Sequence, residues 1–449
     1  MPLARFAILT LAGAGHLHPT GAIGRELLSR GHSVAVIASE SARPITDRLE
    51  LPLLPFADSP EIDRSRSLPL ISALPGMRLS ARLMRAAVQV LNQAPAMLRQ
   101  FQADAVLVDQ NVLAGVSVAE HLGLPNLTVC SAMMAHEEPA VPPHFTSWGY
   151  SAGGLSRLRN RLTYAGYHAS IWPATRLINR YRRDWGLSPI RRHADYLSPY
   201  AQISQLVPEF DFPRADLPAV CHYVGSLARS RVADEAAFPW NRLDGRKLIY
   251  ASLGTVSRAT KANTRVYRTI AEACAGLEAQ LVLAFGKWSE KAPDWRELVG
   301  ELPGDPLIVD FAPQLLLLQR ADLMITHGGQ NTVLEAIHAG VPMIALPRGA
   351  DQPALAARIE HAGIGLRDSF HRPDANRLRA KIRRVLSDKA FRQRMAEVRA
   401  AVVSAGGASY AADVAERVLV ERRPITRDMM RHAAGLQPIE LANGQAGFH

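Results

Sequence analysis

Short apolar runs of strand length recur along the whole chain, and helix-length amphipathic segments separate them. In the first half the runs are FAILTLA, SVAVIAS, AVLVDQ and NLTVC. In the second half they are KLIYASLG, AQLVLAFG, PLIVDF, ADLMITH and PMIALP. A continuous apolar run of this length suits a strand that is buried on both faces of a sheet. The alternation predicts an α/β protein built from doubly wound parallel sheets.

The chain of 449 residues is long enough for two such domains. A proline-containing stretch with little helical periodicity lies between the halves, so we expect a linker over residues 226–246. The domains then span residues 1–225 and 247–415, and residues 416–449 form a C-terminal helix end and a tail. Ligands of doubly wound sheets bind outside the carboxyl ends of the strands. We therefore expect the two domains to face each other across a cleft.

The composition argues against several classes of protein. Cys130, Cys221 and Cys274 lie far apart, which disfavours a disulfide framework or zinc cluster and favours a reducing cytosol. The net charge is 52 − 41 = +11, but no nucleic-acid-binding motif accompanies it, so we expect no nucleic-acid partner. RFAILTLA continues into a glycine-rich loop and a helix, which favours a buried strand over a signal peptide. No apolar run approaches the ~20 residues of a membrane span. We expect a cytoplasmic protein.

Nine arginines lie between Arg157 and Arg192, interleaved with Leu, Ile, Tyr and Trp. A solvated helix pair is the simpler interpretation of this stretch. A surface that contacts an anionic membrane peripherally is the alternative.

Residues 326–352, THGGQNTVLEAIHAGVPMIALPRGADQ, read as a strand end, a glycine turn, a helix and a further strand. His327, Asn331 and Glu335 are spaced i, i+4, i+8, which predicts one face running from the helix N-terminus. Free N–H groups at that end suit a diphosphate, together with side chains such as Thr332. An ionised carboxylate two turns further along suits a ribose diol.

The longer run FAPQLLLLQRADLMITHGGQNTVLEAIHAGVPMIALPRGADQ, residues 311–352, resembles the nucleotide-sugar signature of family 1 glycosyltransferases, the UDP-glycosyltransferase superfamily. That signature has an aromatic-x-Pro-Gln start, then His-x-Gly-x-Asn-Ser/Thr, Glu, Gly-Val-Pro and a closing Asp/Glu-Gln. The likeness extends from GHLHP to GASYAADVAERVL and so covers both halves. It implies the GT-B fold, in which one Rossmann-like domain binds the acceptor and the second binds the nucleotide sugar.

The resemblance also implies the donor site. The aromatic residue stacks on the nucleobase, and the Gln that follows helps to hold the base and ribose. The His, Asn and Thr bind the diphosphate, the Glu binds the ribose, and the closing Asp-Gln pair binds the transferred sugar. The loop SLGT forms a second wall of this pocket. In this sequence the set is Ser252, Gly254, Thr255, Phe311, Gln314, His327, Gly329, Asn331, Thr332, Glu335, Asp351 and Gln352.

On the acceptor side, His16 follows the first predicted strand in a glycine-containing loop, within GHLHP. It resembles the Gly-His-x-x-Pro of the family, whose His is the general base; His18 in the same loop is the alternative. Asp109 ends the run AVLVD and is the acid best placed to orient that base. Plant members carry their orienting Asp where this chain has residues 112–114, so His16 acting alone stays open.

The resemblance implies an inverting transfer of a hexose from a nucleotide diphosphate sugar to an O–H group of an apolar small molecule. UDP-glucose is the expected donor, and a dTDP-sugar is the alternative because plant members have Trp where this chain has Phe311. No DxD pair lies in the cleft-forming loops, so we expect neither a metal nor a further cofactor. The segments CSAMMAHEEPAVPPHFTSWGYSAGG, AQISQLVPEFDFPRADLPAVCHYVGSL and DQPALAARI resemble the bacterial zeaxanthin glucosyltransferase branch, which implies a carotenoid acceptor. Macrolide, flavonoid or other aglycones are alternatives, as are a nucleotide-sugar epimerase and a non-catalytic sugar-nucleotide-binding protein.

Overall fold

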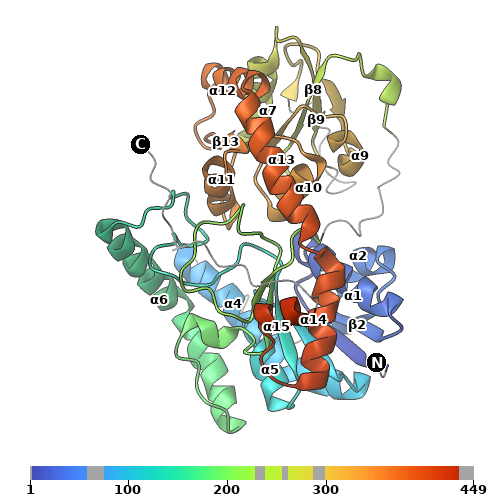
Figure 1. Cartoon of the computed structure of the whole chain (residues 1–449), viewed down its shortest axis with the longest axis vertical. Coiled ribbons are helices and arrows are strands. Elements are labelled where there is room, and N and C mark those ends of the chain that lie inside the picture. The colour runs from blue at the N-terminus through green and yellow to red at the C-terminus, as the bar shows by residue number, and fades with distance from the viewer. Residues whose placement is uncertain (1–2, 58–74, 228–237, 255–260, 287–298, 434–449) are drawn as a thin grey trace.

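The computed structural model describes residues 3–57, 75–227, 238–254, 261–286 and 299–433. Two parallel sheets with helices on both faces form two domains, one above the other in Figure 1. Every strand pair in both sheets is parallel, as the continuous apolar runs predict. The predicted GT-B architecture is confirmed in its two doubly wound domains.

The first sheet has the strand order β3-β2-β1-β4-β5-β6-β7. Its strands are β1 Arg5–Leu9, β2 Ser33–Ser39, β3 Leu53–Phe56, β4 Ala105–Asp109, β5 Asn126–Cys130, β6 Ala201–Ser204 and β7 Cys221–Tyr223. The order reverses between β1 and β4, which lie side by side. Loops leave such a switch point in opposite directions and open a crevice at the carboxyl ends of the two strands.

The second sheet has the strand order β10-β9-β8-β11-β12-β13 and reverses between β8 and β11. Its strands are β8 Lys247–Ser252, β9 Ala279–Ala284, β10 Leu307–Val309, β11 Leu323–Thr326, β12 Met343–Ala345 and β13 Gly365–Arg367. Each sheet therefore has one switch point, and the segments with the candidate functional residues follow its strands.

Helices cover both faces of each sheet (Figure 1). The larger helices of the first domain are α1 Ala14–Ser29, α2 Arg43–Arg48, α4 Pro75–Phe101, α5 Gly115–His121 and α6 Gly154–Asp184. Those of the second are α7 Lys261–Cys274, α9 Gln314–Leu318, α10 Gln330–Ala339, α11 Gln352–His361, α12 Ala375–Ser387 and α13 Lys389–Ser404. Buried aliphatic clusters lie between these helices and the strands.

The chain ends by returning to the first domain through α14 Gly407–Glu421 and α15 Arg427–Ala433. Arg30 at the end of α1 donates to Asp413 at 2.6 Å and to Glu416 at 2.8 Å. His32 lies 3.0 Å from the same Glu416 carboxylate. The expected boundary at residue 415 falls within α14, which packs as a whole helix on the first domain. We propose that the nucleotide-sugar-binding domain ends near residue 405.

Four short strands were not predicted from the sequence, namely β3, β6, β7 and β13. Each has three or four residues, and β3 contains Pro55. Their sequences are LLPF, AQIS, CHY and GLR, so each contains a proline or polar residues and none reads as a continuous apolar run. Strand pairing in the sheet, rather than local pattern, determines them.

Candidate active site

His16 lies within helix α1, because that helix begins at Ala14. The expectation that His16 and His18 lie in a loop was therefore wrong. Pro19 has no N–H, so it cannot donate a helical hydrogen bond to the carbonyl of Gly15. The side-chain amide of Asn331, from the second domain, donates to that carbonyl at 3.4 Å. The α1 and α10 N-termini thus meet across the domain boundary.

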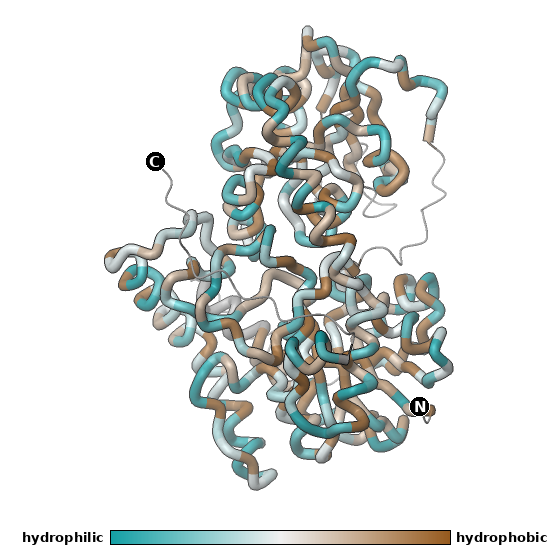
Figure 2. Tube along the Cα trace, viewed as in Figure 1, coloured by the Kyte–Doolittle hydropathy of each residue, from teal (hydrophilic) through white to brown (hydrophobic). Residues whose placement is uncertain are grey.

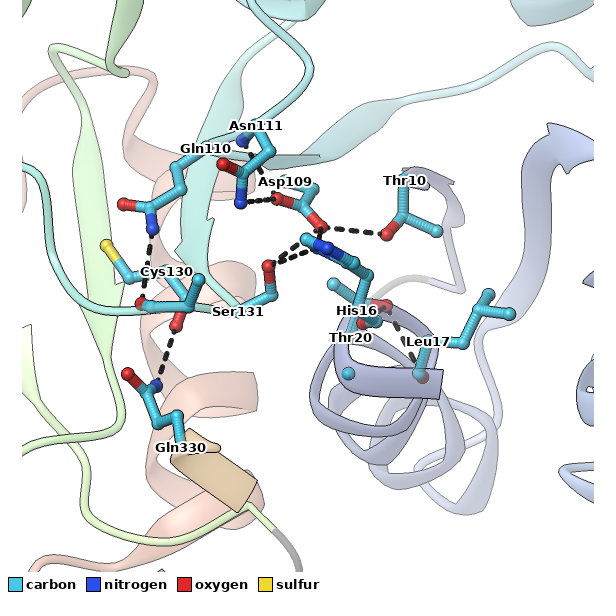
Figure 3. Close-up of polar contacts among 12 residues, drawn as sticks. Thr10, His16, Leu17, Thr20, Asp109, Gln110, Asn111, Cys130, Ser131 and Gln330 are labelled. Atoms are coloured by element: carbon cyan, nitrogen blue, oxygen red, sulfur yellow. Dashed lines mark hydrogen bonds and ion pairs between the residues drawn. The ribbon is translucent and has the colours of Figure 1, made fainter. Parts of the chain in front are cut away.

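The ring of His16 points toward the carboxylate of Asp109 at the end of β4 (Figure 3). Its Nδ1 lies 2.8 Å from Oδ2 of Asp109. The imidazole is partly exposed, whereas the carboxylate is completely buried. With Nδ1–H donating to Asp109, Nε2 is left as the basic nitrogen. The sequence left open whether Asp109 orients His16 or whether His16 acts alone. The structure brings Asp109 into contact with His16.

Three further groups hold Asp109, and the sequence pattern had indicated no role for them (Figure 3). Ser131 Oγ donates to Oδ2 at 2.8 Å, and Thr10 Oγ1 donates to the same oxygen at 3.0 Å. The backbone N–H of Asn111 donates to Oδ1 at 2.9 Å. Ser131 and Thr10 directly follow β5 and β1. Both residues lie at the carboxyl ends of predicted strands, and carboxyl ends of parallel strands meet at one sheet edge. Their positions could therefore have indicated a contact with Asp109.

The electrostatics of the pair favour an ionised Asp109 and a basic His16. Burial alone would lower the pKa of His16, but the hydrogen bond and charge of Asp109 outweigh it and raise that pKa above its usual value. Burial likewise would raise the pKa of Asp109, and its contacts with His16, Asn111 and Ser131 lower it. The negative charge therefore stays on Asp109, where it can stabilise an imidazolium.

An apolar cavity of about 130 Å³ adjoins the carboxylate side of this pair. Thr10 and Asn111, which both bond to Asp109, belong to its wall. The large apolar side chains of the wall are Leu11, Phe56, Leu83, Val90, Val112 and Leu113. Residues 112–114 thus line the cavity. The site can hold an apolar group next to a candidate base.

In the second domain, His327 directly follows β11, and α10 begins only at Gln330. His327 therefore lies before the helix and not on the helical face that its spacing suggested. Burial lowers its pKa to about 4, and the charge of Arg348 adds to this effect. Its buried Nδ1 has no hydrogen-bond partner among the described residues. A neutral imidazole with a spare buried nitrogen suits a bound ligand.

Two glycines make room for the His327 ring. A Cβ at Gly254 would lie 2.7 Å from Cε1 of His327, and a Cβ at Gly329 would also collide with the ring. Gly254 has a φ of +84°, which further favours glycine. The loop after β8 and the loop after β11 therefore close on one histidine.

Gln314 and Glu335 contact each other beside the second sheet. Gln314 Nε2 donates to Glu335, and the Tyr250 hydroxyl donates to Gln314 Oε1 at 3.2 Å. Glu335 is buried in α10, and Phe311 stands out in solvent with 39% of its surface exposed. A buried carboxylate can accept from sugar hydroxyls, and an exposed aromatic ring can stack on a flat base.

Asp351 links the two halves of the site. Its Oδ2 accepts from the backbone N–H of Met133 in the first domain at 3.0 Å. Burial raises the pKa of Asp351, and its charge contributes to raising the pKa of His16. Gln352 Oε1 accepts from the backbone N–H of Arg348 at 2.9 Å. The closing Asp-Gln pair therefore lies at the boundary between the domains.

The remaining donor-site candidates are placed around these groups. Ser252 ends β8, and its hydroxyl oxygen accepts from the N–H of Gly254 at 3.4 Å. Thr332 lies in the first turn of α10 and is half-buried. Thr255 lies outside the described residues.

A family model described as "Erythromycin biosynthesis protein CIII-like, C-terminal domain" matches residues 269–418. The chain is also 33% identical to a zeaxanthin glucosyltransferase of Pantoea ananas, over 94% of this chain and 98% of that protein. The chain belongs to the family 1 glycosyltransferases. A zeaxanthin glucosyltransferase of Pseudescherichia vulneris is likewise 33% identical to this glycosyltransferase, over 93% and 98% of the two lengths.

Solved structures agree with this assignment. The structure of the glycotransferase of kitacinnamycin superposes on this chain with a TM-score of 0.73 and is 26% identical to it in sequence. The match covers 93% of this chain and 100% of that one. VinC, solved in complex with dTDP, gives a TM-score of 0.66 at 19% identity, over 93% and 100%. At that identity the likeness to VinC concerns the fold alone. The GT-B fold and the resemblance stated from the sequence are confirmed.

Proposed function

We propose that this glycosyltransferase moves glucose from UDP-glucose to a hydroxyl group of an apolar small molecule, with inversion at the anomeric carbon. The observation that carries the proposal is the His16–Asp109 pair, 2.8 Å apart, beside an apolar cavity. The pair lies at the switch point of the first sheet, and the N-terminus of α10 contacts the same end of α1.

In the proposed reaction, His16 Nε2 accepts the proton of the acceptor hydroxyl while that oxygen bonds to the anomeric carbon. The bond from this carbon to the β-phosphate oxygen breaks, and its electron pair leaves with UDP. Asp109 keeps the imidazole in the required tautomer and stabilises the imidazolium. Attack on the face opposite the leaving diphosphate converts an α-linked donor into a β-glycoside.

The departing diphosphate gains negative charge, and hydrogen-bond donors at the N-terminus of α10 can stabilise that charge. The helix N-terminus presents free N–H groups, and Asn331, Thr332 and the spare nitrogen of His327 add donors. We expect these groups to suffice without a metal ion, so transfer should continue in excess EDTA. Activity that stops in EDTA and returns with magnesium would contradict this part of the mechanism.

The rest of the donor is assigned from the family signature of residues 311–352. Phe311 stacks on the uracil ring, and Gln314 and Glu335 hold the base and ribose. Asp351 and Gln352 take the hydroxyls of the glucose, and support comes from the effect of the Asp351 charge on His16 and from its contact with Met133 of the first domain. Support comes from the exposure of the Phe311 ring and the contact of Gln314 with Glu335. Ser252 and Gly254 complete the wall.

A carotenoid diol is the acceptor class that the observations favour. The cavity next to Asp109 is lined mainly by aliphatic and aromatic side chains, which suit a hydrocarbon ring better than a polar aglycone. Two curated relatives at 33% identity are named as zeaxanthin glucosyltransferases. Such an acceptor dissolves in a bilayer, so we place the reaction at the cytoplasmic face of the membrane, with peripheral contact.

In the described residues, none of the helices has both the length and the apolar character to cross a bilayer.

Mass spectrometry of the products from a mixed panel tests the proposal. Carotenoid diols, macrolides and flavonoids are offered together with UDP-glucose, and the His16→Ala variant serves as the inactive control. We expect the mass of one or two added glucose units on the carotenoid diols. Transfer to macrolides or flavonoids with carotenoids untouched would overturn the acceptor assignment. A change in the sugar nucleotide without any acceptor product would indicate an epimerase.

A further inference from the structure

Helix α6 exposes large hydrophobic side chains on its outer face. Among the described residues, four of the eight large hydrophobic side chains that stand out in solvent belong to this one helix. They are Leu155, exposed to 86%, Leu158 to 53%, Leu162 to 66% and Trp172 to 55%. In Figure 1, α6 lies at the margin of the first domain, and Figure 2 shows hydrophobic and hydrophilic residues alternating along it.

The positions of the three leucines place them on one stripe of the helix. Leu155, Leu158 and Leu162 follow the spacing i, i+3, i+7. Tyr164 and Ile171 point to the opposite side and are buried against the domain. The leucines are therefore not the core-facing side of α6. The helix has a second apolar stripe that nothing in the described structure covers.

Exposed arginines lie along the same helix, and Arg176, Arg180 and Arg183 fall on the side of the leucine stripe. Arg157, Arg161, Arg176, Arg180 and Arg183 are exposed, and none of them pairs with a carboxylate in the described part of the chain. The two other arginines of the helix are already engaged, since Arg159 covers the Trp148 ring and Arg182 pairs with Glu120. Asp184 at the end of α6 is its one acidic residue. The face is strongly cationic.

We propose that the outer face of α6 is a docking surface for an anionic lipid bilayer. Leucines can enter the acyl boundary while the long arginine side chains extend to the lipid phosphates. Trp172, with the Arg176 guanidinium 5.4 Å above its ring centroid, suits the headgroup level. A nucleic acid would use the arginines but leave the leucines in water. A protein partner would have to supply a carboxylate for each of these unpaired cations, whereas an anionic bilayer offers negative charge over its whole surface.

The inner face of α6 connects this surface to the catalytic cleft. Asn160 donates to the carbonyl of Pro139 at 3.0 Å, and His168 lies 2.9 Å from the Glu137 carboxylate. The segment they hold leads back to Met133, whose N–H reaches Asp351. The segment that leads to the candidate active site is therefore held directly by the helix that docks. The purpose of docking rests on the proposed function, but lipid binding itself requires neither donor nor acceptor.

Vesicle flotation of the full chain tests the surface, with phosphatidylcholine vesicles compared against vesicles that also contain phosphatidylglycerol. We expect binding only to the anionic vesicles, and it should weaken as salt rises. Replacing Arg176, Arg180 and Arg183 with Gln should weaken binding on the order of 100-fold, because each arginine contributes a factor of about five. The matched control replaces the exposed arginines Arg48, Arg372 and Arg383 and should bind almost as the parent does.

A second variant, Leu155→Gln/Leu158→Gln/Leu162→Gln, should remove the binding that survives at high salt. Val420→Gln, at an equally exposed position on α14, should not. The sequence has six tryptophans, so the Trp172→Phe spectrum is subtracted to isolate Trp172. Its emission should shift to the blue on adding anionic vesicles. Unchanged titration with UDP verifies that each variant is folded.

Several outcomes would overturn the proposal. These are no binding to anionic vesicles, equal losses in the α6 and control arginine variants, or an unshifted Trp172 signal. Preferential binding of RNA over vesicles would assign the face to a nucleic acid instead. The flotation experiment does not measure sugar transfer. A failure of vesicle binding would therefore leave the proposed reaction intact, and a failure of the proposed reaction would leave the lipid-binding surface intact.

Discussion

Asp109 is a completely buried carboxylate that protein donors, not water, keep ionised. Thr10, Ser131 and His16 all contact its Oδ2, while Oδ1 accepts from the Asn111 backbone. One oxygen thus orients the imidazole and the other fixes the loop that follows β4. Asp109 therefore makes the contacts that both expected roles require, which are orienting His16 and capping the following loop.

Replacing His16 with Ala should reduce sugar transfer by about 10²–10⁴-fold, the usual contribution of a general base. UDP affinity should stay nearly unchanged, because the base acts on the acceptor. Steady-state rates and calorimetric titration with UDP measure the two effects separately. His18→Ala, two residues further along α1, is the control and should keep most of its activity. A deficit in His18→Ala with His16→Ala active would reverse the assignment.

The pH profile of kcat/KM should report the His16–Asp109 pair. Because Asp109 raises the pKa of His16, the base is protonated over a wider acidic range, and activity should fall as pH drops through that raised pKa. In Asp109→Asn the hydrogen bond and charge of Asp109 are lost while burial and the smaller effect of Asp351 remain, so the acidic limb should move to lower pH while the plateau rate falls. An unmoved limb would mean that Asp109 does not act through His16.

At the scale of elements, the loops after β8 and β11 form one unit around His327. Gly254→Ala places a methyl group against the ring and a side chain at a φ of +84°. We expect a stability loss of about 1 kcal/mol or more from the backbone alone. UDP binding should weaken by about 1.5–3 kcal/mol if the ring no longer donates to a phosphate.

Thermal unfolding and calorimetric titration with UDP measure these two losses. Gly149→Ala is the matched control, since a Cβ there meets open space and the backbone is unstrained. If Gly254→Ala binds UDP as tightly as the parent, His327 is not a phosphate ligand.

At the scale of the whole molecule, a buried ion pair joins the two domains. Arg358 on α11 donates to Asp211 of the first domain at 2.7 Å, and both side chains are 1% exposed. Arg214 donates to the other oxygen at 2.6 Å, and the Arg358 guanidinium lies 4.2 Å from the centroid of Phe212. Since α11 begins directly after Asp351, the pair also holds one wall of the cleft.

Asp211→Asn should destabilise the protein by about 3–5 kcal/mol, because it leaves two buried guanidinium groups without their counter-charge. Burial would raise the pKa of Asp211, but Arg214 and Arg358 lower it strongly. The stabilisation should therefore be complete above the ordinary Asp range and be lost as pH falls through the depressed pKa. Urea unfolding at several pH values measures this.

The control for that experiment is Glu397→Gln, which breaks an exposed pair with Arg394. Exposed pairs contribute only about 0–1 kcal/mol, so its unfolding curve should barely move. Equal effects of the two substitutions would show that the interdomain pair adds nothing to stability.

The sequence by itself determined the parallel α/β class, the nine strands that lie in continuous apolar runs and the family. Buried strands such as AVLVD and LVLA need apolar residues on both faces, so they appear in the sequence as continuous apolar runs. The signature of residues 311–352 is equally local, because one strand, one turn and one helix present most of its polar groups. His16 was found through a short motif of the same kind.

Only the tertiary structure decided which distant residues meet. Ser131 and Thr10 reach Asp109 because β5, β4 and β1 are neighbours in the sheet, although they are about 20 and 100 positions from it along the chain. The return of α14 to the first domain and the Asp211–Arg358 pair likewise depend on how the two domains pack. Short strands such as β7 and β13 exist because a neighbour supplies their hydrogen bonds. Contacts between residues that are far apart in the chain produce no periodic pattern in a short stretch of sequence. They can therefore be identified only in the folded structure.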